Sequence, residues 1–213
     1  MQGLIGRKRG MTEVFDGQGR RLAVTVLEAG PCVVVQRKTR ERDGYDAVQL
    51  GLEERKESRT PRPQIGHFKR AGVTPRMVLR EMALDDGDSL KEGDTVGADV
   101  FQGVAYVDVV GMTKGKGFQG VVRRHSMAGG PMTHGGHSKR RIGAIGQRAV
   151  PGRVHLGHRM PGHMGHVRAT AQNLQVVEVR GPENLLLVRG AVPGPRGGLV
   201  LVKRALKRSG KAA

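Results

Sequence analysis

The chain has 213 residues and a formal net charge of +18, with 37% hydrophobic residues, 3% aromatic residues and 34 glycines. This length fits one large domain or two small ones, and the glycine content indicates that part of the chain does not pack around a core of its own. No run approaches the ~18 apolar residues of a membrane span, and the N-terminus lacks the apolar segment of a secretion signal. The single cysteine, Cys32, excludes an intrachain disulfide. We therefore expect an intracellular, cytoplasmic protein without a membrane partner.

The first half of the sequence favours short strands separated by Gly-Pro and Asp-Gly turn signals. Residues 47–52 alternate in the manner of a strand with one buried face. Residues 54–64 are polar with two prolines and predict a surface loop, and residues 64–72 predict one short helix. Cys32 lies in an apolar run without an activating motif, which predicts a buried structural thiol. The predicted strands span 21–30, 32–39, 45–54, 77–82, 94–101 and 104–110.

The C-terminal part also favours short strands, which are predicted over 173–181, 184–192 and 198–205. The first two are joined by the turn signal Gly-Pro-Glu-Asn at 181–184, and the last five residues, SGKAA, are predicted to form a solvated tail. Short strands linked by tight turns at both ends of a chain are typical of one all-β barrel or sandwich.

Residues 111–168 interrupt this pattern with 14 glycines and almost no strand signal. Structureless segments of this length are usually functional or disordered, so we interpret the segment as an extended loop inserted in a globular domain of residues 1–110 and 169–213. A small irregular lobe is expected over about 53–92, and a helical turn over 117–125. Alone, the inserted loop cannot bury enough apolar surface to offset its conformational entropy, so we expect it to become ordered on binding.

The charge of the chain is concentrated in and around this loop. Residues 1–108 hold 18 Lys/Arg and 17 Asp/Glu, residues 109–177 hold 11 Lys/Arg and no acid, and residues 178–213 hold 8 Lys/Arg and 2 acids. A long acid-free run creates concentrated positive potential, for which the natural partner is a polyanion.

The loop contains G-x-G-x-x-G at 115–120, directly after a predicted strand. A dinucleotide site would also need an acid about 20 residues further on, and the next acid is Glu178. A phosphate-binding Walker loop fails because Gly117, and not Ser or Thr, follows Lys116. We interpret the motif as a basic turn whose backbone, with Lys114 and Lys116, approaches phosphates closely.

Six of the loop's seven histidines form three pairs with HxxH spacing, at 134/137, 155/158 and 163/166. Zinc ligands are usually oriented by carboxylates or carbonyls, and this acid-free segment supplies no carboxylate and eleven repelling cations. General acid–base catalysis likewise needs an orienting partner. Solvated histidines without a role and a zinc-binding module remain alternatives, while the leading hypothesis has the imidazoles contact RNA phosphates or bases.

The cations are spaced through glycine, proline and small residues, as expected for a segment that contacts structured RNA through its backbone. Aromatic residues are nearly absent, which argues against a stacking platform for single strands. The candidate RNA-binding residues are Lys114, Lys116, Arg123, Arg124, His134, His137, Lys139, Arg140, Arg141, Gln147, Arg148, Arg153, His155, His158, Arg159, His163, His166 and Arg168.

One motif is specific enough to point to a family. The pattern Phe101-x6-Asp108-x2-Gly111-x-Thr113-x-Gly115-Lys116-Gly117-x2-Gly120-x3-Arg124 resembles the signature of the universal large-subunit ribosomal protein three family, in its bacterial form. GLIGRKRGMTEVF at 3–15 is similar to that family's N-terminal strand with its Gly-Met-Thr turn. GPMTHGGHSKRR, IGQRAVPGRV and NLLLVRGAVPGPRGG are similar to further family segments in the same order.

The resemblance implies a mainly β fold, a six-stranded barrel of the translation-factor kind with a long basic extension. It implies a non-enzymatic structural constituent of the large ribosomal subunit that binds 23S ribosomal RNA early in assembly. The extension would reach toward the peptidyl transferase centre, and neighbouring large-subunit proteins would be partners. No cofactor beyond Mg²⁺ associated with the RNA is implied, and no small-molecule substrate.

Two positions within the resemblance need separate mention. Some bacterial relatives carry an N-methylated glutamine in a Gly-Gln segment, and the matching position is Gln147. Other relatives have an aromatic residue after the signature arginine, where this chain has His125. Two functions of other classes are kept as alternatives: a zinc-dependent hydrolase or zinc module built on the histidine pairs, and a free-standing nucleic-acid chaperone.

Overall fold

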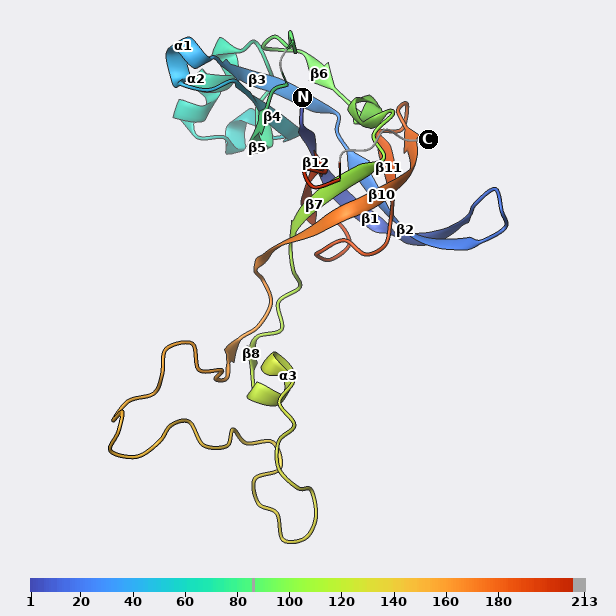
Figure 1. The fold of residues 1–213 in the computed structure, drawn as a ribbon. Coiled ribbons are helices and arrows are strands. Elements are labelled where there is room, and N and C mark those ends of the chain that lie inside the picture. Colours follow the sequence, from blue (N-terminus) through green and yellow to red (C-terminus); the bar gives the residue numbers. More distant parts are fainter. Residues whose placement is uncertain (86, 209–213) are drawn as a thin grey trace. The chain divides into compact units, whose positions relative to one another are not determined.

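The computed structural model describes residues 1–85 and 87–208, so the predicted tail SGKAA lies outside the described residues. The chain divides into two compact units (Figure 1). Unit 1 combines Met1–Met112 with Arg168–Ala213, and unit 2 is Thr113–Val167. Within unit 1, Met112 and Arg168 are partners in neighbouring strands, so the chain leaves and re-enters this unit at adjacent strand ends.

Unit 1 contains a closed barrel of six strands, as the family resemblance implied. Every neighbouring pair is antiparallel. Closure leaves the barrel without a continuous free edge, because each strand has a neighbour on both sides. In order around the barrel the strands are β1 (Gly3–Phe15), β12 (Leu199–Arg204), β7 (Tyr106–Met112), β10 (Arg168–Arg180), β11 (Leu185–Arg189) and β2 (Arg21–Ala29).

The barrel is filled by aliphatic side chains from strands that are distant in sequence. Leu4, Leu27, Val109, Leu186 and Val202 are all fully buried and belong to one hydrophobic cluster. Burying such a side chain contributes roughly 1.5–3 kcal/mol relative to leaving it in water. The β-branched and leucine-rich runs that predicted these strands are therefore also what holds the barrel together.

A second sheet in unit 1 has the order β5 (Arg76–Ala83), β4 (Ala47–Glu54), β3 (Cys32–Lys38) and β6 (Thr95–Val96). It occupies the part of the chain around the expected lobe, and three short helices accompany it: α1 (Arg40–Asp43), the 3-10 turn η1 (Glu57–Arg59) and α2 (Arg62–Arg70). Val34, Leu50 and Met82 join the same hydrophobic cluster as the barrel. Strand β4 is buried on both faces rather than one. Val48, Leu50 and Leu52 join the same cluster as the barrel, and Gln49, on the opposite face, contacts His67 of α2.

Cys32 is buried, as predicted, and its Sγ lies 3.4 Å from the carbonyl oxygen of Ile5. Burial, which disfavours the charged thiolate, raises the pKa of Cys32 to about 11. The thiol therefore acts as a small core side chain and not as a nucleophile.

One local prediction in this unit is wrong. The strand predicted over 94–101 is only Thr95–Val96, followed by the 3-10 helix η2 (Ala98–Phe101). Asn184 explains the break, because its Oδ1 accepts a hydrogen bond from the Ala98 amide at 3.3 Å and crowds Gly97. The short helix predicted over 64–72 is present as α2, with its bounds shifted to Arg62–Arg70, since proline is well tolerated in the first turn of a helix.

The Gly-Met-Thr turn implied by the family resemblance is also absent from its expected place. Residues 10–12 lie inside β1, which continues to Phe15. The register between β1 and β2 shifts between Lys8 and Gly10, so one extra residue is absorbed as a bulge. A bulge bends a strand without ending it, and the chain turns only beyond Phe15, at Asp16–Arg20.

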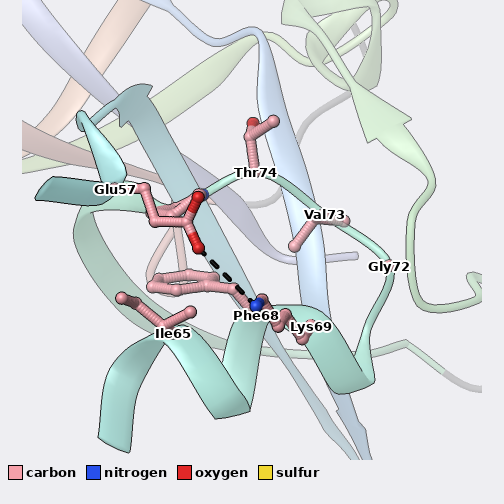
Figure 2. A pocket seen from close by; sticks show the side chains of 8 residues that line it. Glu57, Ile65, Phe68, Lys69, Gly72, Val73 and Thr74 are labelled. Carbon is pink, nitrogen blue, oxygen red and sulfur yellow. Dashed lines mark ion pairs between the residues drawn. The ribbon is translucent and has the colours of Figure 1, made fainter. Parts of the chain in front are cut away.

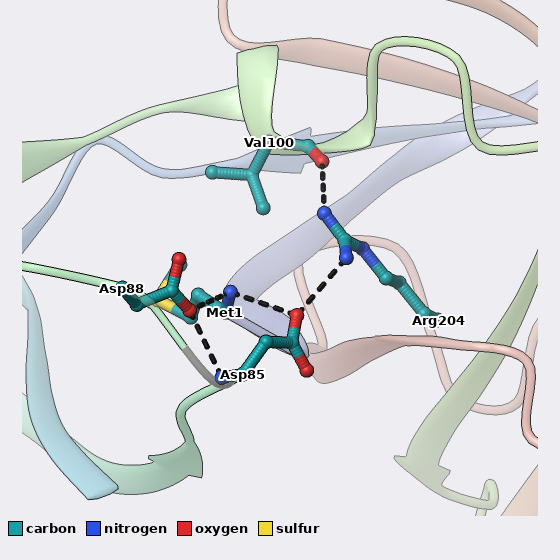
Figure 3. Close-up of polar contacts among 5 residues, drawn as sticks. All are labelled: Met1, Asp85, Asp88, Val100 and Arg204. Atoms are coloured by element: carbon teal, nitrogen blue, oxygen red, sulfur yellow. Dashed lines mark hydrogen bonds and ion pairs between the residues drawn. The ribbon is translucent and has the colours of Figure 1, made fainter.

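Polar contacts tie the loop after β5 to the barrel (Figure 3). Arg204 on β12 donates to the Asp85 carboxylate at 3.0 Å and to the Val100 carbonyl at 3.4 Å. The Met1 ammonium bonds the same Asp85 carboxylate at 3.0 Å and also that of Asp88. These contacts bridge segments far apart in sequence. Over the described ranges 1–85 and 87–208, no helix is long and apolar enough to cross a membrane.

Candidate nucleic-acid interface

Unit 2 begins and ends in a paired segment, here called the stem, formed by residues 113–125 and 160–167. Strand β8 (Phe118–Gln119) pairs with β9 (Gly162–His163). The Lys116 amide donates to the Met164 carbonyl at 2.8 Å, and the Met164 amide donates to the Gly117 carbonyl at 3.0 Å. The loop predicted to be almost free of strand pattern is therefore closed by a short antiparallel ladder.

The stem is reinforced at Thr113 and Val167. The Thr113 amide donates to the Val167 carbonyl at 2.9 Å, and the Val167 amide donates to the Thr113 hydroxyl at 3.2 Å. The signature threonine thus has a backbone-pairing role. Gly165 lies so close to the opposite arm that an added Cβ would be 2.1 Å from the Lys114 carbonyl oxygen. Only glycine permits this approach at φ +76°.

Helix α3 (Val121–His125) realises the helical turn predicted over 117–125. Val121 is buried, and the Arg124 guanidinium donates to the Met160 carbonyl at 2.7 Å. A His125 ring nitrogen lies 3.1 Å from the same oxygen. Arg124, a sequence-predicted RNA contact, is therefore half-buried within the stem and engaged with protein backbone. No sequence signal identified Met160 as its partner.

Residues 126–159, here called the distal loop, expose nearly all their side chains. Their backbone hydrogen bonds are mostly local, such as Gly136 to Thr133 at 3.1 Å, Arg141 to Ser138 at 2.9 Å and His158 to His155 at 3.3 Å. Every predicted contact residue in this range is exposed: His134, His137, Lys139, Arg140, Arg141, Gln147, Arg148, Arg153, His155, His158 and Arg159.

The remaining predicted residues lie on the stem or at the start of the strand that follows it. Lys114, Lys116 and Arg123 are exposed on the first arm, and His163 and His166 are exposed on the second. In the ladder, His163 stands directly opposite Phe118. Arg168 is exposed at the start of β10, which belongs to unit 1. The stem thus brings the residues of the Gly-rich motif beside the last histidine pair, which the sequence separates by nearly fifty residues.

The electrostatics of unit 2 are one-sided. Because residues 109–177 contain no Asp or Glu, none of its cations forms an intra-unit ion pair. Uncompensated exposed cations at this density bind polyanions by charge neutralisation and counterion release. Among the described residues there is no group of three His, Cys, Asp or Glu side chains placed to hold a metal ion.

Unit 2 also exposes large apolar side chains to an unusual degree. Leu156 is 98% exposed, Val150 84% and Phe118 76%. Because these side chains stay in water, a fixed structure of unit 2 alone buries little apolar surface and gains little stability from it. A partner that contacts the segment along its length would cover them.

A hollow of about 370 Å³ lies elsewhere, beside α2 in unit 1 (Figure 2). Ile65 and Phe68 line it, with Val73 opposite. Its two charged groups, Glu57 and Lys69, face each other at 3.7 Å. A paired carboxylate and ammonium leave neither a free base nor an activated nucleophile, and none of the predicted contact residues lines this hollow.

Known families and curated proteins similar to this chain agree with one another. The family model described as Ribosomal protein L3 matches residues 87–182. A protein of Heliobacterium modesticaldum named large ribosomal subunit protein uL3 is 52% identical over 206 residues, covering 97% of this chain and 98% of the relative. Proteins of the same name from Pelotomaculum thermopropionicum and Brachyspira pilosicoli are 50% and 47% identical. They cover 98% and 99% of this chain, and 99% and 97% of their own lengths.

Proposed function

Because the chain belongs to the ribosomal protein L3 family, we propose that it is a structural constituent of the large ribosomal subunit that binds 23S ribosomal RNA. The family is one of structural ribosomal proteins and not of enzymes. The single observation that carries RNA binding is unit 2, whose exposed cations have no acidic partner within residues 109–177. An RNA backbone supplies the missing negative charge.

We further propose that the distal loop threads between RNA helices. A chain spans at most ~3.3–3.6 Å per residue, so a doubled-back segment the length of unit 2 can reach up to ~90 Å. This reach supports a path from the subunit surface toward the peptidyl transferase centre. Phosphates from several RNA helices would converge on its arginines and lysines, and the histidines would donate hydrogen bonds at short range.

Binding early in assembly follows from the same arrangement. A loop of this length cannot be inserted between RNA helices that have already packed, so the helices must close around it. The distal loop, whose backbone hydrogen bonds are mostly local, would acquire its fixed path at that step. Neighbouring large-subunit proteins are proposed partners of the complex, and the cytoplasmic ribosome is its proposed location.

Gln147 is the proposed methylation position. It lies exposed in the distal loop, within reach of a modifying enzyme before the loop is enclosed by RNA. Mass spectrometry of the peptide containing Gln147, from purified ribosomes, would detect one added methyl group. An unmodified peptide at full occupancy would refute the assignment.

Co-sedimentation tests the main proposal. The tagged chain expressed in cells should sediment with large subunits and with their assembly precursors, and remain there after a high-salt wash. Recovery in the light fractions with bound RNA would instead favour the free-standing nucleic-acid chaperone. Stoichiometric zinc in RNA-free protein, absent after His134→Ala or His137→Ala, would favour the zinc module.

The state of the distal loop can be tested by hydrogen exchange. In the free protein, amides of residues 126–159 should exchange almost as fast as in an unstructured peptide, and they should become protected in large subunits. Strong protection of the distal loop in the free protein would contradict ordering upon RNA binding.

A further inference from the structure

Helix α2 presents a cationic face on the side opposite its buried residues. Phe68 is 1% exposed, and a His67 ring nitrogen lies 2.8 Å from Oε1 of Gln49 on β4, which fixes the inner side of the helix. Arg62 and Lys69 are separated by seven residues, close to two turns of 3.6, so both lie on the outer side. Arg70 adjoins them, and all three are exposed.

Positive charge is concentrated around this face, although residues 1–108 taken together are nearly neutral. Residues 55–70 hold six Lys/Arg and a single acid, Glu57. Lys69 pairs with that acid at 3.7 Å. Within residues 1–85 and 87–208, no hydrogen-bond or ion-pair partner is found for four exposed side chains of the segment: Lys56, Arg59, Arg62 and Arg70.

Several other exposed arginines of unit 1 form ion pairs. Arg20 pairs with Asp16 at 2.8 Å, and Arg21 pairs with Glu13 at 3.4 Å. Arg180 pairs with Glu178 at 2.7 Å. Surface cations on a globular unit are ordinarily interspersed with acids in this manner. Residues 55–70 therefore gather several unpaired cations in one short segment, in contrast to these paired arginines.

Gly66 is a second, independent feature of the same face. It lies in the middle of α2, one turn from both Arg62 and Arg70, and its φ is not in the left-handed region. A Cβ added there would meet no atom within 4 Å. Glycine destabilises a helix interior relative to alanine, and neither packing nor backbone conformation of the chain requires it here. A partner whose backbone approaches the helix closely would require it.

We propose that this face of α2 is a second contact with the RNA sugar-phosphate backbone, separate from the contacts of unit 2. The proposal rests on the proposed function, since it takes RNA as the polyanion. Arginine grips phosphate oxygens with two parallel hydrogen bonds, and Gly66 lets the sugar-phosphate chain lie across the helix. An acidic side chain of a protein could reach an arginine without any gap at the helix centre, so RNA explains Gly66 and an acidic peptide does not. The contact residues are Lys56, Arg59, Arg62, Gly66, Lys69 and Arg70.

The test uses the full chain and a transcript of large-subunit ribosomal RNA, with affinity measured over a range of salt concentrations. The double variant Arg62→Gln/Arg70→Gln should reduce the slope of log K against log salt by about 0.7–0.9 for each phosphate that is no longer neutralised. The matched control is Arg20→Gln/Arg21→Gln, which removes the same charge from ion-paired arginines and should leave the slope nearly unchanged. Equal effects of the two double variants would overturn the proposal.

The variant Gly66→Ala distinguishes an effect on RNA binding from an effect on folding stability. The variant should unfold at a higher urea concentration than the parent chain, because alanine is the better helix former. It should nevertheless bind the transcript several-fold more weakly, because the added Cβ holds the RNA backbone away. A more stable variant with unchanged affinity would show that no backbone approaches Gly66, and the proposal would fail.

The two proposals fail in distinguishable ways. If the parent chain does not bind the transcript, RNA binding itself is refuted. If substitution of Lys139, Arg140 and Arg141 weakens binding while the α2 variants bind like their parent, the proposed function stands and the α2 contact is refuted. Absence of a partner protein from subunits carrying the α2 variants, with RNA affinity intact, would assign this face to a protein and equally refute the RNA contact.

Discussion

The guanidinium of Arg124 donates a hydrogen bond to the backbone carbonyl of Met160 at 2.7 Å, across 36 residues of sequence. Gly162 lies against the same side chain, where an added Cβ would be 2.8 Å from Nη1. The arginine thus closes the base of the distal loop with a charged donor on a neutral carbonyl. Arg124, one of the cations predicted to contact RNA, therefore also holds the two arms of the stem together.

Replacing Arg124 should open the stem without unfolding unit 1. Arg124→Ala removes a hydrogen bond worth about 1 kcal/mol, so the amides of Lys116 and Met164 should exchange about fivefold faster. Arg123→Ala is the control, because Arg123 is exposed and its side chain bonds only the neighbouring Gln119, at 3.3 Å, among the described residues. Identical exchange rates in both variants would show that the Arg124 contact does not support the stem.

Substitutions at two glycines of the stem allow the cost of backbone strain to be measured apart from the cost of steric crowding. Gly117 and Gly165 both have positive φ, at +67° and +76°, but only Gly165 has an atom, the Lys114 carbonyl oxygen, in the path of a Cβ. Gly117→Ala should therefore destabilise the stem by about 1–2 kcal/mol from the left-handed conformation alone. Gly165→Ala should destabilise it clearly more. Amide exchange at Thr113 and Val167 measures both, and a larger effect at Gly117 would contradict the predicted approach of the two arms.

The salt dependence of RNA binding should locate the phosphate contacts of the distal loop. Changing Lys139, Arg140 and Arg141 together to glutamine should reduce the slope of log K against log salt by about 2–3, if each neutralises one phosphate. The control triple Arg9→Gln, Arg20→Gln and Arg21→Gln removes the same charge from cations paired with Glu28, Asp16 and Glu13. An unchanged slope for the first triple would show that these residues face water in the complex.

Stability should fall at high pH because of Cys32. Its pKa is raised to about 11 from 9.0 by burial, so the folded chain keeps the thiol proton where the unfolded chain loses it. The contribution is complete below about pH 9 and is lost as pH rises through 11, by at most about 3 kcal/mol. Urea unfolding of the parent chain and of Cys32→Ala should differ in pH dependence between about pH 9 and about pH 11, the interval between the two pKa values. Parallel curves would show that Cys32 ionises as readily in the folded chain.

Prediction from the sequence succeeded where a local pattern has one structural meaning. The β-branched runs at 21–30, 104–110 and 198–205 correspond to barrel strands β2, β7 and β12. Alternation and turn chemistry act over a few residues, so they are readable without knowledge of the partner strand. The acid-free run is likewise evident from the composition. A segment without acids cannot form ion pairs within itself, so the lack of internal pairing could also be predicted.

Prediction failed where a distant residue decides the local conformation. The pattern at 94–101 is that of a strand, but a hydrogen bond to Asn184 turns its second half into a 3-10 helix. Nothing in the sequence separates Cys32–Lys38, which joins the second sheet, from Arg21–Ala29, which joins the barrel. Averaging the charge over residues 1–108 also concealed the unpaired cations beside Gly66.

The order of amino acids alone establishes where most of the strands lie, that unit 2 is basic and without acids, and which family motif the chain carries. Folding decides which strands pair, that Arg124 bonds the Met160 carbonyl within the stem, and that space is left beside Gly66 among the cations of α2. The physical reason is the range of the interactions. Propensity, periodicity and composition are properties of neighbouring residues, whereas strand order, close backbone approach and the pairing of charges depend on residues that only folding brings together.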